Sequence, residues 1–138
     1  MRNRTPVALL ALACITASAH AAGILGLWLT PKNHGRVIVE PCGDAVCARI
    51  ADGDQLRANP AQADVNNPDP AKRTRPVKDL RILDGYRGGP AAWRGGTVYD
   101  PQTGDLSNDS TLTLTSQGTL EVEGCRFLLC RSETWRRP

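Results

Sequence analysis

The stretch that decides the fold class is Thr111-Leu112-Thr113-Leu114-Thr115-Ser116-Gln117-Gly118-Thr119-Leu120-Glu121-Val122-Glu123. Apolar and polar residues alternate on both sides of Ser116-Gln117-Gly118, so the leucines and the valine point to one face of a sheet. The central tripeptide has the composition of a turn. This pattern predicts two half-buried antiparallel strands joined by a turn.

Similar short segments, separated by turn signals such as Asn33-His34-Gly35 and Asp100-Pro101-Gln102-Thr103-Gly104, fill most of the remaining chain. No long helix is indicated. The short connections favour an antiparallel meander, and closure into a barrel would remove its exposed edges. We therefore predict an all-β fold, a small antiparallel barrel of about eight strands, at residues 24–29, 36–40, 45–51, 80–84, 93–99, 111–115, 119–123 and 128–136.

One connection, between Asp52 and Asp79, is much longer than the others and rich in proline. Within it, Asp69 can cap a short helical turn that has Pro70 at its first position. Arg75 precedes Pro76 and is therefore restricted to an extended conformation. The prolines predict an ordered loop, and a loop this long in a small domain is usually functional or mobile.

The N-terminal residues have the pattern of a cleaved secretory signal. Arg2 and Arg4 precede an apolar run over 7–17, and Ala19-His20-Ala21 suits a signal peptidase. The apolar run is about half the length that crosses a bilayer, so we predict no transmembrane segment. Cleavage after Ala21 would leave 22–138 as a single domain, periplasmic or secreted.

A lipoprotein signal ending at Cys14 is the competing interpretation of the N-terminus. It is less favoured because Leu12 stands where a small residue is preferred.

The net charge of the exported part indicates which partners to expect. Without Arg2 and Arg4 the 17 basic residues become 15 against 14 acidic ones, scattered among one another. A nucleic-acid binder would show a basic stripe, so nucleic acid is not an expected partner.

The other four cysteines form two equal spacings, Cys42-x4-Cys47 and Cys125-x4-Cys130. An even number in an exported chain predicts disulfides, and Gly43-Asp44-Ala45-Val46 offers good turn chemistry for a local Cys42–Cys47 bridge. A local Cys125–Cys130 bridge is also expected. A crossed pairing stays open, because the residues between these two cysteines are apolar rather than turn-like. A four-thiolate zinc site is the disfavoured rival. We predict no metal and no cofactor.

Five segments, taken in order, resemble the bacterial exported family called domain of unknown function 2147. They are Gly26-Leu27-Trp28, Asn67-Pro68-Asp69-Pro70, Arg73-x-Arg75-Pro76, Trp93-x-Gly95-Gly96-x-Val98-Tyr99-Asp100-Pro101-x-x-Gly104 and Thr134-Trp135-Arg136. The resemblance runs from Gly26 to Arg137. It implies a lipocalin-like β-barrel exported to the periplasm, with no established reaction.

The resemblance also implies structural roles. In lipocalins the tryptophan of Gly-x-Trp packs under the barrel and carries an arginine from the last strand. Here that tryptophan is Trp28, two residues after Gly26, and we expect Arg131 or Arg136 to stack on it. Large aromatic residues are scarce in this chain. We expect the remaining ones that matter to the fold to be core residues: Trp93, Tyr99 and Trp135.

No residue pattern predicts catalysis. His34 lies in a predicted turn without a partner at useful spacing, and no serine lies in a nucleophile elbow. Oxygen-bearing side chains gather on the long loop, but their spacing is wrong for a calcium loop and cations surround them. These side chains are Asp64, Asn66, Asn67 and Asp69.

The sharper hypothesis for the loop is a ligand site. Arg73 and Arg75, with Asn67 and Asp69, would hold the acidic head of an amphiphile whose tail enters the barrel. The alternative is that both arginines tie the loop to Asp64, Asp69 or Asp100. These considerations favour a non-enzymatic binder or carrier of a small apolar or amphiphilic molecule. The second hypothesis is an envelope protein-interaction module with a filled barrel, and the third is an enzyme without a recognised motif.

Overall fold

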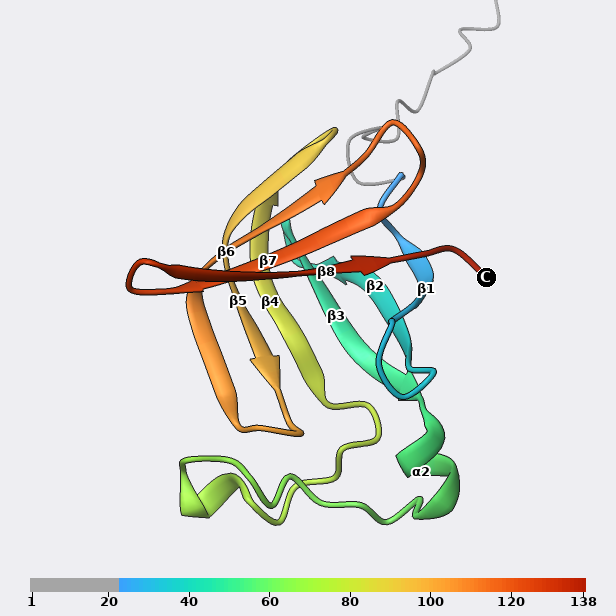
Figure 1. Ribbon diagram of the computed structural model, residues 1–138, viewed down its shortest axis with the longest axis vertical. Helices are drawn as coiled ribbons and strands as arrows, with labels where there is room; N and C mark the ends of the chain where they lie inside the picture. The colour runs from blue at the N-terminus through green and yellow to red at the C-terminus, as the bar shows by residue number, and fades with distance from the viewer. Residues whose placement is uncertain (1–22) are drawn as a thin grey trace, which may run out of the picture.

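The computed structural model describes residues 23–138, so the predicted signal sequence and Cys14 lie outside the described residues. Eight antiparallel strands follow one another in a single sheet in chain order, as Figure 1 shows. The prediction of an all-β fold with about eight strands is confirmed. The strands are β1 (Gly26–Leu29), β2 (Arg36–Cys42), β3 (Ala45–Asp52), β4 (Arg81–Gly88), β5 (Ala92–Asp100), β6 (Asp105–Leu114), β7 (Leu120–Arg126) and β8 (Leu129–Trp135).

The sheet curls until its two edges meet. Leu29 at the end of β1 pairs with Arg136, just after β8. The backbone N–H of Leu29 donates to the carbonyl of Arg136 at 2.7 Å, and the N–H of Arg136 donates back at 3.0 Å. These two hydrogen bonds join the first and last strands, so the edge groups that would otherwise invite pairing with another chain are satisfied there.

The inside of the sheet is filled by large side chains. Trp28, Tyr86 and Trp93 are each at most 1% exposed. Aliphatic side chains that alternate along the strands pack against these rings, as the two-residue period predicted. The core cluster also contains Ile24, Val37, Val39, Val46, Ala48, Leu83, Leu112, Leu120, Val122 and Trp135. A barrel of eight strands is narrow enough for such side chains to fill it.

The first half of β6 is an element that the sequence pattern did not predict. Its inward positions are Ser107 and Ser110, both buried, in place of aliphatic residues. Ser107 Oγ donates to the carbonyl of Cys125 at 2.6 Å, and Ser110 Oγ donates to that of Gly96 at 2.8 Å. Because both hydroxyls have hydrogen-bond partners, serine can occupy inward positions of this strand. The strand therefore lacks the alternation of apolar and polar residues that would have predicted it.

The long connection between β3 and β4 is ordered and runs along one end of the sheet, as Figure 1 shows. It begins with α2 (Asp54–Ala58), which buries Leu56, and later forms the 3-10 helix η1 (Pro70–Lys72). Asp69 caps η1, since its side chain accepts a hydrogen bond from the N–H of Ala71 at 3.0 Å. The predicted cap with Pro70 at the first position is therefore confirmed.

Both local disulfides are present, between Cys42 and Cys47 and between Cys125 and Cys130. The first joins the paired ends of β2 and β3, and the second joins opposite residues of β7 and β8. Crossed pairing and a four-thiolate zinc site are thus both excluded. Disulfides persist in oxidising surroundings, which indicates an extracytoplasmic environment. Among residues 23–138, no helix has both the length and the apolar character needed to cross a membrane.

Candidate functional site

The most concentrated polar site surrounds Asp64, a carboxylate that the long loop buries completely. The hydroxyl of Tyr99 donates to Asp64 Oδ1 at 2.5 Å. Asn67 Nδ2 and Arg75 Nε donate to Asp64 Oδ2 at 2.9 and 3.0 Å. The guanidinium of Arg75 also lies 5.6 Å from the centre of the Tyr99 ring. A buried carboxylate needs such compensation, and here it has one cation and two neutral donors.

The surroundings of Tyr99 hold its hydroxyl in the protonated state. Burial, followed by the hydrogen bond to Asp64, raises the pKa of Tyr99 to about 12. A phenol with a raised pKa is a poor general base at neutral pH, because it has no negative charge to use. This cluster is thus suited to fixing the loop on β5, not to proton transfer.

A second contact fixes the loop to the β5–β6 turn. Asn66 Nδ2 donates to the carbonyls of Pro101 and Gln102 at 3.3 and 2.8 Å. Gly104 lies against the loop so closely that a Cβ at this position would be 2.0 Å from the carbonyl oxygen of Asn66. The two proline-containing segments, far apart in the sequence, therefore pack together, and the glycine between them is required by space.

The residues of the predicted ligand site are held by the loop itself. Asn67 is buried, and its Oδ1 accepts from the N–H of Asp69 at 2.9 Å. Arg73 Nε donates to the carbonyl of Asn67 at 2.8 Å. Of the arginine alternatives, the structure shows the tie between Arg75 and Asp64. Within the described residues, the terminal Nη atoms of Arg73 and Arg75 have no protein partner.

The oxygen-bearing side chains of the loop are used in different places, as their hydrogen bonds show. Asp64 faces Arg75 and Tyr99, Asn66 faces the β5–β6 turn, and Asp69 caps η1. Elsewhere in residues 23–138, two groups have metal-ligand spacing, and both contain a disulfide: Cys42, Cys47 and Asp84, and Glu123, Cys125 and Cys130. A disulfide sulfur is not a thiolate and is a poor metal ligand.

An arginine stacks on Trp28, but the prediction that it is Arg131 or Arg136 is wrong. The guanidinium of Arg137 lies 3.9 Å from the centre of the Trp28 ring. Side chains alternate across an extended chain, so with Trp135 inside, Arg136 points out and Arg137 returns to the barrel end. Arg131 pairs with Gly124, toward the far end of β8. Arg137 also donates to the carbonyls of Gly23 and Leu27 at 2.9 and 3.2 Å.

His34 has a partner after all, contrary to the expectation from spacing. Its Nδ1 lies 2.6 Å from Asp54 Oδ2, and Arg57 donates to both Asp52 and Asp54. His34, Asp52 and Arg57 border an open hollow of about 590 Å³. The side chain of His34 is 86% exposed. An exposed His–Asp contact of this kind contributes little to stability.

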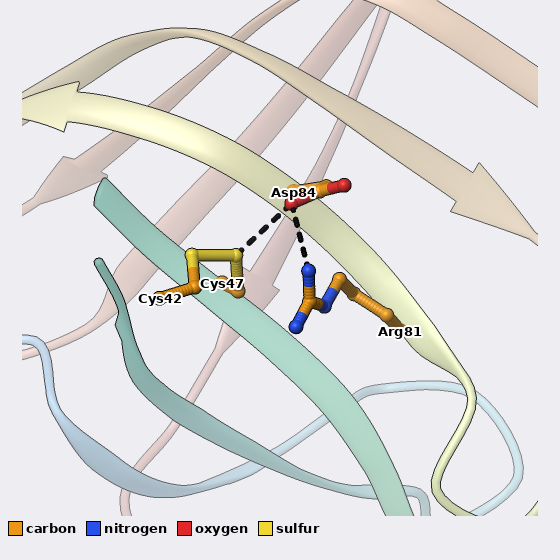
Figure 2. The surroundings of a disulfide bond; sticks show 4 residues. All are labelled: Cys42, Cys47, Arg81 and Asp84. Carbon is orange, nitrogen blue, oxygen red and sulfur yellow. Dashed lines mark hydrogen bonds and ion pairs between the residues drawn. A yellow bond between two sulfur atoms is a disulfide. The ribbon is translucent and has the colours of Figure 1, made fainter. Parts of the chain in front are cut away.

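Figure 2 shows the surroundings of the first disulfide. Asp84 Oδ1 lies 3.1 Å from Cys47 Sγ and 3.3 Å from Arg81 Nη1. Since a bridged sulfur has no proton to donate, the first contact is a sulfur–oxygen contact and the second is an ion pair. Cys47 is buried in the sheet. These contacts indicate a structural bridge between β2 and β3.

The comparisons with known proteins agree with this architecture. The family model for uncharacterized proteins conserved in bacteria (DUF2147) matches residues 26–137. No curated protein matches the chain. A solved structure described as protein HP1028 from the human pathogen Helicobacter pylori, of the lipocalin family, superposes with a TM-score of 0.71 at 20% identity, over 83% of this chain and 82% of that chain. At that identity the likeness shows the fold. The chain thus belongs to the DUF2147 family of uncharacterized bacterial proteins and has a lipocalin-like β-barrel fold.

Proposed function

We propose that this protein is a non-enzymatic binding module of the bacterial periplasm. Its filled barrel is a rigid scaffold, and the binding partner contacts the outer surface of the molecule. This is the interaction-module hypothesis, and the filled interior now favours it over the carrier.

The observation that carries the proposal is the packing of Trp28, Tyr86 and Trp93 inside the barrel, each at most 1% exposed. A barrel of this size holds either side chains or one small ligand. Three large rings occupy the space that a ligand would need. The polar groups support a non-enzymatic role as well, because Tyr99 stays protonated and His34 is solvated.

Mass spectrometry of protein purified from a bacterial periplasm tests this proposal. Under native conditions we expect the mass of residues 22–138 less four hydrogens, with no further mass. The control is the same protein unfolded, stripped of lipid and refolded. A stoichiometric lipid-sized mass that leaves on unfolding, absent from the refolded control, would overturn the proposal.

A carrier of a small amphiphile is the second candidate, and two observations favour it. The fold resembles that of a lipocalin-family protein. Arg73 and Arg75 each donate a hydrogen bond from Nε to another residue of the loop. Their Nη atoms have no protein partner in the described part of the chain. A guanidinium edge suits a carboxylate or phosphate head group. Asn67 and Asp69 would then hold the loop that presents these arginines.

The test of this candidate is the variant Arg73→Gln. Arg75 is unsuitable because its loss would leave Asp64 buried without a cation. If an acidic amphiphile copurifies, Arg73→Gln should reduce its occupancy at least tenfold, whereas Arg94→Gln, an exposed arginine on β5, should not. Equal occupancy in both variants would exclude Arg73 from the ligand site.

A further inference from the structure

The β7–β8 hairpin ends in an apolar tip, formed by Phe127, Leu128 and Leu129. These residues are 98%, 102% and 65% exposed. The last pair of the hairpin is Arg126 with Leu129, so Phe127 and Leu128 are the two residues of the turn. The last pair between β6 and β7 is Asp109 with Cys125. The apolar tip therefore projects beyond the last β6–β7 pair, and it stands clear of the other strands in Figure 1.

Folding alone does not account for these side chains. Phe127 has φ 55°, a left-handed conformation that turns of this kind normally give to glycine or asparagine. A bulky residue is strained in that conformation. Both turn residues are also apolar and fully exposed to water. Phe127 and Leu128 thus satisfy neither the conformational preference of the turn nor the preference for polar residues in water. This indicates that they contact something outside this chain.

The apolar tip is held in place before any partner arrives. The Cys125–Cys130 bridge closes the hairpin immediately behind it, with the two Cα atoms 4.0 Å apart. Arg126 Nη1 pairs with Asp105 Oδ1 at 3.1 Å. A preorganised tip loses little conformational entropy on binding, so more of its apolar contact is retained as affinity.

We propose that the apolar tip inserts into the surface of a phospholipid membrane. Three side chains on a convex turn offer far less than the roughly 800 Å² that each partner buries in a stable protein interface. A bilayer surrounds a convex tip from all sides and needs no matching groove. Arg126 and Arg131, both exposed, flank the apolar tip at the depth where lipid phosphates would lie.

Nearby carboxylates limit the electrostatic part of this attraction. Asp105 already pairs with Arg126, and Asp109 and Glu123 are exposed near the base of the hairpin. Apolar insertion should therefore dominate, with a smaller gain from anionic lipid. This inference goes beyond the proposed function, since it concerns where the protein is held and applies whatever its target is.

The experiment is cosedimentation of the oxidised chain 22–138 with vesicles of phosphatidylethanolamine and phosphatidylglycerol. The test variant is Phe127→Gly with Leu128→Asn, residues that suit a turn whose first φ is positive, so the hairpin should fold at least as well. The matched control is Leu106→Asn, which removes an exposed leucine of β6 that is not part of the apolar tip. Size-exclusion chromatography with light scattering gives the oligomeric state of each protein.

We expect the parent chain and Leu106→Asn to bind vesicles alike, and the tip variant to bind at least tenfold more weakly. Failure of the parent chain to bind, or equal binding by the tip variant, would overturn the proposal. A dimer of the parent chain that the tip variant converts to a monomer would also overturn it, since the occupant would then be a second copy. None of these outcomes affects the filled-barrel proposal, which the mass measurement tests separately.

Discussion

Arg137 closes the end of the barrel with one side chain. It stacks on Trp28 and donates to two backbone carbonyls. We expect Arg137→Gln to lower the free energy of unfolding by about 1–3 kcal/mol, because the cation–π contact and these hydrogen bonds are lost together. Urea unfolding measures this. The matched control is Arg136→Gln, whose side chain points outward and should change stability by less than about 0.5 kcal/mol. Equal effects would show that the stacking contributes nothing.

The adjacent glycines of β5 have different reasons to be glycine. A Cβ on Gly96 would lie 2.4 Å from Cδ2 of the buried Tyr86 ring and 2.6 Å from the carbonyl oxygen of Asp84. A Cβ on Gly95 would meet nothing within 4 Å, but its φ is +76°. Gly96→Ala should therefore cost about 3 kcal/mol or more, and Gly95→Ala about 1 kcal/mol. Thermal and urea unfolding of both variants would reveal the reverse order if this account is wrong.

The long loop should depend on Asp64 more than on any other carboxylate it contains. Asp64→Asn leaves Arg75 without its charge partner and brings an amide N–H toward other donors. We expect a loss of roughly 2–4 kcal/mol and faster hydrogen exchange across 59–77. Asp69→Asn is the matched control, since asparagine caps a helical turn about as well as aspartate. Unchanged exchange in Asp64→Asn would mean that the loop is anchored elsewhere.

Strands could be predicted where an apolar face alternates with a polar one. This holds for residues 111–115 and 119–123, and it fails for the start of β6. There Ser107 and Ser110 are the buried residues, and only their hydrogen bonds to distant carbonyls make burial acceptable. Sequence alone gives no signal for a satisfied buried hydroxyl, so the first half of β6 was missed.

The loop cluster was predictable in part. The cap at Asp69 follows from local residues, and an ion pair between a loop arginine and Asp64 was one of the alternatives. The role of Tyr99 was missed, because it approaches Asp64 from a strand 35 residues away. The stacked arginine was misassigned for a related reason. Choosing between Arg136 and Arg137 requires knowing which residue of the last strand faces inward.

The whole molecule should lose stability in alkali. Burial raises the pKa of Tyr86 to about 12. The unfolded chain releases this proton near pH 10, whereas the folded chain keeps it, so the stability is fully present below pH 10 and is lost as the pH rises toward 12. For this one group we expect a slope of about 1.4 kcal/mol per pH unit in that window.

Urea unfolding across this window measures the slope, and absorbance of the tyrosinate reports the titration. Tyr86→Phe is the control. Ser110 has a single hydroxyl proton, which it donates to Gly96, so Tyr86 must be the donor in their 2.5 Å contact. Phenylalanine therefore leaves Ser110 Oγ still donating to Gly96. Tyr99 has a similarly raised pKa and should keep part of the slope in this variant. An unchanged slope in Tyr86→Phe would contradict the assignment.

The bridge between Leu29 and Arg136 has a consequence for the order of folding events. β1 can pair with β2 early, but its second edge stays open until residues near the C-terminal end of β8 arrive. Pairing across most of the chain is slow, because the closure entropy must be met before the contact forms. While it is open, each edge can capture a strand of another molecule. The last step of folding therefore coincides with the greatest risk of aggregation, and a chaperone that shields β1 and β8 would act at this stage.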